Sequence, residues 1–171
     1  MRNEVGVRVI GIDPGYERLG VAVIEKPNKG KEFLIFSDCF KTSPKKPHSE
    51  RLLLLSNFID NCLNQYKPDI MALESLFFNT NQKTAVKVAE ARGVILSRAA
   101  HFDVETIEIN PLQVKMAITG YGRCEKRQMI SNIPRIIKIE KKITYDDEFD
   151  AIAVGLTCTA ALKTLLIKKQ L

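Results

Sequence analysis

The stretch VGVRVIGID, residues 5–13, decides the fold class of this chain. It begins with alternating valines, ends in a short apolar run and is rich in β-branched side chains, which predicts a strand that stops at Asp13-Pro14-Gly15. Two more β-like stretches follow, residues 19–25 and 33–40, and a turn-forming Pro-Asn-Lys-Gly sequence separates them. We therefore expect three strands that are hairpin-connected neighbours.

Helices and strands alternate after these three strands, so the pattern predicts an α/β layered domain. The expected elements are a helix over 49–66 with Ser49 as its N-cap, a strand over 69–74, a helix over 79–100 capped by Asn79, a strand over 104–109, a short helix from Pro111 to near Gly120, a helix from about Glu125 interrupted near Pro134, and a long helix from about Tyr145 towards Lys168.

Length and composition are those of an ordinary soluble domain. The chain has 171 residues, 45% of them hydrophobic and 27% charged, which argues for a single domain over residues 1–171 and against a disordered or disulfide-scaffold chain. Its four cysteines form no CxxC pair, so we expect free thiols and no zinc site. The N-terminus lacks the apolar core and cleavage site of a signal peptide, and no stretch has the length of a membrane span, so a cytoplasmic location is expected.

The charge balance indicates a polyanionic partner. The net charge is +6, and residues 111–142 alone carry eight lysines and arginines against two acids. Residues 26–51 form a second basic region, with seven basic and three acidic side chains. Such segments are typical of proteins that hold nucleic-acid phosphates, with an affinity that falls as salt rises.

Four carboxylates are candidates for a shared metal site. Asp147 and Asp150 lie on the same stripe of the last helix as apolar residues that can pack on the sheet, so both are expected to point inward. Asp13 and Glu74 each close an apolar strand, and neighbouring parallel strands present their ends at one edge of a sheet. Such an oxygen-rich cluster suits Mg²⁺ or Mn²⁺.

Simpler explanations exist for the same residues. Thr144 and Asp147 could form a capping box, with the acids complementing the helix N-terminus. Asp13-Pro14-Gly15 is also an ordinary turn sequence. From the helix alone, the capping and metal-binding interpretations are about equally favoured.

Four blocks of sequence, in this order and spacing, resemble the RuvC family of bacterial Holliday-junction resolvases over nearly the whole chain. They are VIGIDPGYERLGVAVIE, PDIMALESLFFNTNQKTAVKVAEARGVIL, NPLQVKMAITGYGRCEKRQM and DDEFDAIAVGL. The resemblance implies an RNase H-like fold, with a mixed central sheet of three antiparallel strands followed by parallel strands, flanked by helices. It also implies a homodimeric, Mg²⁺-dependent endonuclease that nicks two opposing strands of a four-way DNA junction in homologous recombination and repair, and RuvA and RuvB as partners.

The resemblance also implies a role for each matching residue. The family's acidic set falls on Asp13, Glu74, Asp147 and Asp150, and its functional lysines on Lys115 and Lys126. Its aromatic base-contacting position matches Phe77, and Arg92 belongs to the matching AEARG block as a further candidate DNA contact. Two-metal chemistry with these acids would leave a 5′-phosphate and a 3′-hydroxyl.

Two other functions compete with this interpretation. A YqgF-like nuclease that processes ribosomal RNA would share the Asp-containing first strand but should lack the FFNTNQ and PLQVK blocks. A basic DNA-binding module without catalysis would leave four inward acids to be stabilised by structure alone, which is costly. An actin-like or sugar-kinase-like ATPase needs a second domain and about twice this length.

Overall fold

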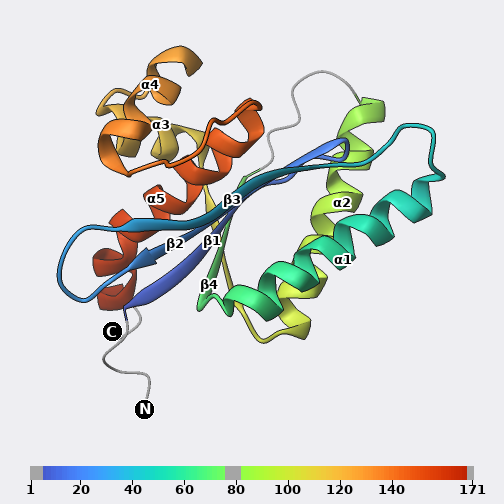
Figure 1. Ribbon diagram of the computed structural model, residues 1–171, viewed down its shortest axis with the longest axis horizontal. Helices are drawn as coiled ribbons and strands as arrows, with labels where there is room; N and C mark the ends of the chain where they lie inside the picture. Colours follow the sequence, from blue (N-terminus) through green and yellow to red (C-terminus); the bar gives the residue numbers. More distant parts are fainter. Residues whose placement is uncertain (1–5, 76–81, 169–171) are drawn as a thin grey trace.

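A mixed five-stranded sheet forms the centre of the fold (Figure 1). The structure, a computed structural model, describes residues 6–75 and 82–168. Its elements are β1 Val7–Asp13, β2 Arg18–Lys26, β3 Phe33–Lys41, α1 His48–Tyr66, β4 Ile70–Glu74, α2 Gln82–His101, β5 Glu105–Ile109, α3 Pro111–Thr119, α4 Lys126–Ile136 and α5 Asp146–Lys168. The strand order is β3-β2-β1-β4-β5.

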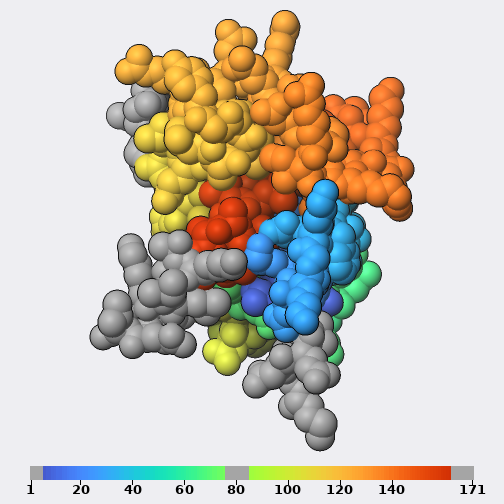
Figure 2. All heavy atoms as spheres, turned by 90° about the vertical axis from the view of Figure 1, so that its left-hand side faces the viewer, coloured from blue at the N-terminus to red at the C-terminus, as the bar shows by residue number. Residues whose placement is uncertain are grey.

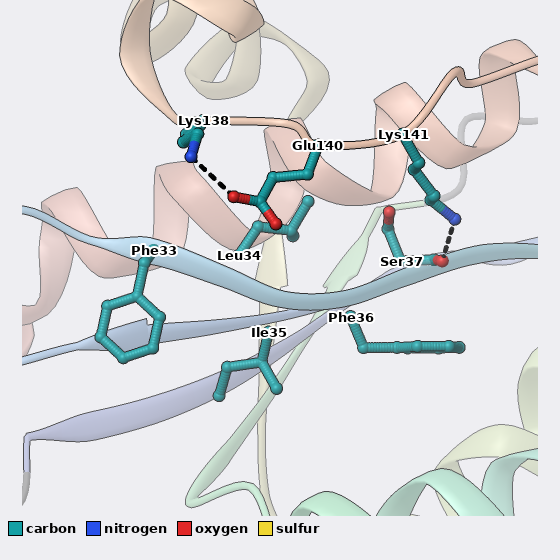
Figure 3. A pocket seen from close by; sticks show the side chains of 8 residues that line it. All are labelled: Phe33, Leu34, Ile35, Phe36, Ser37, Lys138, Glu140 and Lys141. Carbon is teal, nitrogen blue, oxygen red and sulfur yellow. Dashed lines mark hydrogen bonds and ion pairs between the residues drawn. The ribbon is translucent and has the colours of Figure 1, made fainter.

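Strand directions confirm the predicted sheet. β1 pairs with β2, and β2 with β3, in antiparallel register, whereas β1–β4 and β4–β5 are parallel. The β2–β3 register shifts between Val23 and Ile24, and Ile35 is the unpaired residue of the resulting bulge. In Figure 3, Ile35 and Phe36 point to one side of the sheet, and Leu34 and Ser37 to the other.

Helices cover both faces of the sheet, and each face has its own apolar core. In Figure 1, α1 and α2 lie on one face and α3, α4 and α5 on the other. Alternate residues of β1 separate these layers: Ile10 and Ile12 belong to the α1–α2 core, and Val9 to the α5 core. α5 is fully buried at Ala151, Ile152 and several further positions, as expected for a helix that packs on the sheet.

Two details of the helices differ from the predictions. α1 begins at His48 with Pro47 as its N-cap, so Ser49 is the second helical residue and not the cap. α4 continues through Pro134 to Ile136, so the predicted interruption is wrong. Pro134 has no N–H to donate to Ile130, so α4 lacks one main-chain hydrogen bond there, but Ile137 N still donates to the Ile133 carbonyl at 3.0 Å and the helix continues past the proline.

The cysteines are free and buried, as expected. Burial raises the pKa of the Cys39 and Cys158 thiols to about 11 and that of Cys62 to about 12, so these three stay protonated near neutral pH. Within the described ranges, no helix is long and apolar enough to cross a membrane.

Candidate active site

Asp13 and Glu74 lie side by side because β1 and β4 are parallel neighbours. Ile12 pairs with Leu73, and the next residue of each strand is the carboxylate. Val9 on β1 and Ala72 on β4 belong to the α5 core, so residues an even number further along each strand face the same way. Both carboxylates therefore point towards α5 at the same end of the sheet.

Glycines let α5 approach the sheet backbone. A Cβ at Gly20, which pairs with Asp13, would lie 1.9 Å from the Asp147 carbonyl oxygen and 3.2 Å from the Asp13 Cβ. A Cβ at Gly11 would lie 2.3 Å from the Ala151 carbonyl oxygen. Side chains at these positions would push the helix away, so the glycines allow the first turns of α5 to lie on β1 and β2.

The first turns of α5 bring the second pair of carboxylates to this end of the sheet. The side chains of Asp147 and Asp150 are 19% and 15% exposed, so both point inward, as the helical projection predicted. The Asp146 side chain is 61% exposed. Glu148 is buried on the other side of the helix, where the Ser37 hydroxyl donates to it at 2.6 Å and Lys141 Nζ lies 2.6 Å away. Glu148 is therefore held away from the other acids.

The electrostatics of the site show that the four acids act on one another. Burial, and after it the negative charges of Asp150, Glu74 and Asp147, together raise the pKa of Asp13 to about 8, against a smaller opposing effect of Lys126. Burial also raises the pKa of Glu74 and Asp150, to which nearby acids add. A group of carboxylates in this state is stabilised by protons or by cations.

Two cations of the chain already contact the cluster. Lys126 Nζ donates to Asp150 Oδ2 at 2.7 Å and lies 3.7 Å from Asp146 Oδ2. Burial alone would lower the pKa of Lys126, but its hydrogen bond and the charge of Asp150 raise it. Arg18 Nε lies 3.2 Å from Asp147 Oδ2, and that buried oxygen has no hydrogen bond of good geometry.

α3 places Lys115 on the same side of the sheet. The helix begins at Pro111 after a capping box, in which Leu112 N donates to Asn110 Oδ1 at 2.8 Å, and it ends at Gly120 in the left-handed conformation. The charge of Lys115 acts on Glu74 and lowers its pKa against the larger effect of burial. The structure therefore brings Lys115 and Lys126 to the acids.

The chemistry of the donor set fits a hard divalent cation. Four carboxylates supply oxygen ligands and no thiolate or imidazole, as Mg²⁺ and Mn²⁺ prefer. Within residues 6–75 and 82–168, however, no three His, Cys, Asp or Glu side chains form a ready-made metal cluster. Arg18 pairs with Asp147 and Lys126 with Asp150, and a metal ion held by these acids would take over the role of counter-charge.

Two further residues were predicted to contact DNA. Phe77 falls outside the described residues. Arg92 lies on α2 with a side chain only 15% exposed, and its Nη2 lies 2.7 Å from Glu108 Oε1 on β5. This ion pair gives Arg92 a structural role between helix and sheet, and its DNA-binding role stays a prediction.

Some basic side chains of residues 111–142 pair with groups of the chain itself. Lys141 donates to the Ser37 carbonyl as well as pairing with Glu148, and Lys138 donates to Glu140 at 2.6 Å (Figure 3). These residues border a cavity of about 520 Å³ along the outer edge of β3. In Figure 2, the segment that follows α4 (orange) and the blue β2–β3 region lie on either side of α5 (red).

Arg18 is the contact that the sequence prediction missed. It follows the Asp-Pro-Gly turn and begins β2, so it looks like an ordinary strand-edge residue. The pairing of β1 with β2 is the feature that indicates this contact. Asp13 pairs with Gly20, so the start of β2 lies beside the end of β1 that carries the carboxylate.

Comparison with known proteins identifies the family of the chain. The family model described as "Crossover junction endodeoxyribonuclease RuvC" matches residues 9–158. The RuvC protein of Petrotoga mobilis is 43% identical over 148 residues, covering 86% of this chain and 90% of its own length. That of Caldicellulosiruptor saccharolyticus is 39% identical over 165 residues, covering 96% and 99%.

A solved structure gives the same result at the level of the fold. Thermus thermophilus RuvC, solved in complex with a Holliday junction substrate, superposes with a TM-score of 0.86 at 29% identity, covering 92% of this chain and 96% of that one. The RNase H-like fold implied by the sequence is therefore confirmed. The chain belongs to the RuvC family of crossover junction endodeoxyribonucleases.

Proposed function

We propose that this protein is an endonuclease that resolves Holliday junctions in homologous recombination and repair, with Mg²⁺ as its metal and Mn²⁺ as a substitute. The observation that carries the proposal is the group of four mutually interacting carboxylates at one end of the sheet, in a chain of the RuvC family. The relative from Thermus thermophilus was solved with a Holliday junction substrate, which supports four-way DNA as the substrate class.

Asp13, Glu74, Asp147 and Asp150 would hold two metal ions. Asp13 is the most central, because each of the other three acids contributes to its raised pKa. A bound metal pair supplies an activated water and stabilises the charge that develops on the leaving 3′-oxygen, which leaves a 5′-phosphate. The four carboxylates would hold the metal ions in a fixed position at this end of the sheet.

Lys115 and Lys126 would neutralise the DNA phosphate at the cut. Both ammonium groups act on the acidic cluster, so a phosphate held against it would meet their positive charge. Lys126 would leave Asp150 for this role once a metal ion balances that carboxylate. The remaining basic residues of 111–142 would hold phosphates further from the cut.

A homodimer would deliver the two symmetric nicks, since a four-way junction has approximate two-fold symmetry. A cavity of about 530 Å³ lies between α1 and α2, on the side of the molecule away from α5 (Figure 1). Leu53, which lines this cavity, and Val86 on α2 are each 58% exposed. A second copy of the chain would cover them. RuvA and RuvB partners and a cytoplasmic location follow from the family alone.

Cleavage of three substrates in parallel tests the proposal. Wild type, Asp13→Asn and Asp103→Asn are each given a mobile four-way junction, a linear duplex and an RNA hairpin, with Mg²⁺. Asp103 is a matched control because it is exposed and has φ 55°, a conformation that Asn adopts readily. We expect wild type and Asp103→Asn to cut the junction into nicked duplexes and Asp13→Asn to bind it without cutting.

Three results would contradict the proposal in different ways. Full cleavage by Asp13→Asn would remove the metal-site mechanism. Preference for the RNA hairpin would favour a YqgF-like RNA-processing nuclease, and junction binding without cleavage by wild type would favour a non-catalytic DNA-binding module.

A further inference from the structure

A second cavity adjoins the carboxylate cluster and contains cations that the mechanism above does not use. It has a volume of about 290 Å³ and lies between the β1–β2 turn, α2 and the start of α5. Arg18 and Lys87 line it, together with Tyr16, Glu17 and Asp147. Because Asp147 belongs to both the cavity and the acidic cluster, a ligand here would be the immediate neighbour of the group bound at the cluster.

Buried contacts hold one wall of this cavity in place. Tyr16 is 6% exposed, and the Arg51 guanidinium carbon lies 3.8 Å from its ring centroid. Arg51 is itself buried and donates to Thr42 Oγ1 at 2.9 Å. The Tyr16 hydroxyl is hydrogen-bonded to His48 Nδ1 at 2.8 Å. The turn therefore keeps its shape through contacts with α1.

The two cations reach the cavity from different elements. Arg18, whose side chain is 52% exposed, extends from the start of β2 to within 3.2 Å of Asp147 Oδ2. Lys87 is exposed on α2, and its Nζ lies 5.5 Å from the Tyr16 ring centroid. A guanidinium and an ammonium at one small cavity are the groups that bind phosphate oxygens in proteins.

Two of the residues that line the cavity are acids, so its net charge depends on whether the carboxylate cluster holds a metal ion. Without a metal ion, Asp147 and Glu17 balance Arg18 and Lys87. A divalent cation held by the cluster would neutralise Asp147 and release the Arg18 guanidinium from its ion pair. The cavity would then carry net positive charge while its wall stays unchanged.

We propose that this cavity binds a DNA backbone phosphate next to the one that is cut, with Arg18 and Lys87 as its ligands. The inference rests on the proposed nuclease function. Lys115 and Lys126 approach the cluster from α3 and α4 on one face of the sheet, and Lys87 from α2 on the other. A DNA strand that crosses the cluster would thus meet cations from both layers.

Junction binding by charge-removing variants tests the proposal. Fluorescence anisotropy gives the Kd of wild type, Lys87→Gln, Arg18→Gln and Lys67→Gln across a salt series, with Ca²⁺ or with EDTA. Lys67 is the matched control, because it is exposed between α1 and the start of β4, at the opposite end of the sheet, and belongs to neither basic region. Thermal unfolding of each variant checks that it is folded.

We expect Lys87→Gln to bind about tenfold more weakly than Lys67→Gln in Ca²⁺, with a salt slope lower by about 1, as for the loss of one phosphate contact. In EDTA the difference between these two variants should shrink. Equal affinities and slopes for Lys87→Gln and Lys67→Gln in Ca²⁺ would overturn the proposal, and so would a defect of the same size in EDTA.

A neutral methylphosphonate placed at one backbone position at a time identifies the phosphate. At one position beside the cut, wild type should lose about tenfold in affinity and Lys87→Gln should lose little, because the contact is already gone. Equal losses for both proteins at every position would refute the assignment. If wild type neither binds nor cuts the unmodified junction, the proposed function fails first, which separates that failure from failure of the phosphate site.

Discussion

Replacing Asp13 by Asn is expected to stabilise the metal-free protein in neutral and alkaline solution, although it removes a side chain of the active site. The pKa of Asp13 rises from its ordinary value of 3.8 to about 8, chiefly through burial and then through the charges of the other acids. Between these two values the unfolded chain releases the proton and the folded chain keeps it. Stability in the absence of metal therefore falls as pH rises from about 4 to about 8.

The size of the effect follows from the displacement of the pKa. Each pKa unit corresponds to about 1.36 kcal/mol, so a rise from 3.8 to about 8 is on the order of 5 kcal/mol at pH 8 and close to zero at pH 4. For a chain of this length, about 1 kcal/mol moves Tm by roughly 2 to 4 °C. Asn has nearly the same shape as Asp and no charge, so the variant does not lose stability in this way as pH rises. Its Tm at pH 8 should therefore exceed that of wild type by about 10 °C or more.

Thermal unfolding in EDTA at several values between pH 4 and pH 8 measures this difference. Asp103→Asn is the control, because it removes an exposed carboxylate at the far end of the sheet and should follow wild type. Mg²⁺ added at pH 8 should raise the Tm of wild type more than that of Asp13→Asn, because the metal offsets the repulsion that Asn has removed. Parallel pH profiles for wild type and Asp13→Asn would refute the reasoning.

Four further substitutions separate the roles of neighbouring residues. Glu148→Gln should lower the free energy of unfolding by about 1 to 3 kcal/mol in urea and leave junction cleavage unchanged, since this buried acid faces away from the cluster; lost cleavage in a folded variant would place it in the metal set. Gly20→Ala should cost about 1 to 3 kcal/mol or more, because its Cβ would collide with the α5 backbone, and an unchanged Tm would contradict that packing. Lys126→Ala should slow single-turnover cleavage about tenfold or more, and a wild-type rate would remove its role at the phosphate. Phe77→Ala should weaken junction binding by about 1 to 3 kcal/mol if its ring stacks on a base, and normal binding and cutting would end that prediction.

The carboxylates could be predicted from sequence because each depends on a simple periodicity. Asp13 and Glu74 end apolar strands, and the alternation along a strand then decides which face they point to. Asp147 and Asp150 are three residues apart, so they share one side of a helix whose apolar stripe marks the buried face. Each pattern belongs to a single strand or helix. The fold brings the four carboxylates together without changing the face on which each of them lies.

The contacts that the sequence did not reveal depend on pairings between distant segments. Arg18 meets Asp147 only because β2 returns antiparallel to the end of β1. Glu148 looked like one more acid of a crowded helix start, yet it is buried against β3 and Lys141, which no helical projection includes. The extent of α4 was misjudged because Pro134 removes a single main-chain hydrogen bond, and the bond from Ile137 N to the Ile133 carbonyl still forms beyond it.

The close approach of α5 to the glycines of β1 and β2 has a consequence for the order in which the protein folds. More than a hundred residues separate Asp13 from Asp147, and a main-chain contact across Gly20 joins them. Contacts between such distant segments bear a large loop-closure entropy and tend to form late. A partly folded chain, with the hairpins of β1–β3 already paired but α5 undocked, would therefore have an incomplete metal site. The ability to cut DNA would then depend on the docking of α5 onto β1 and β2.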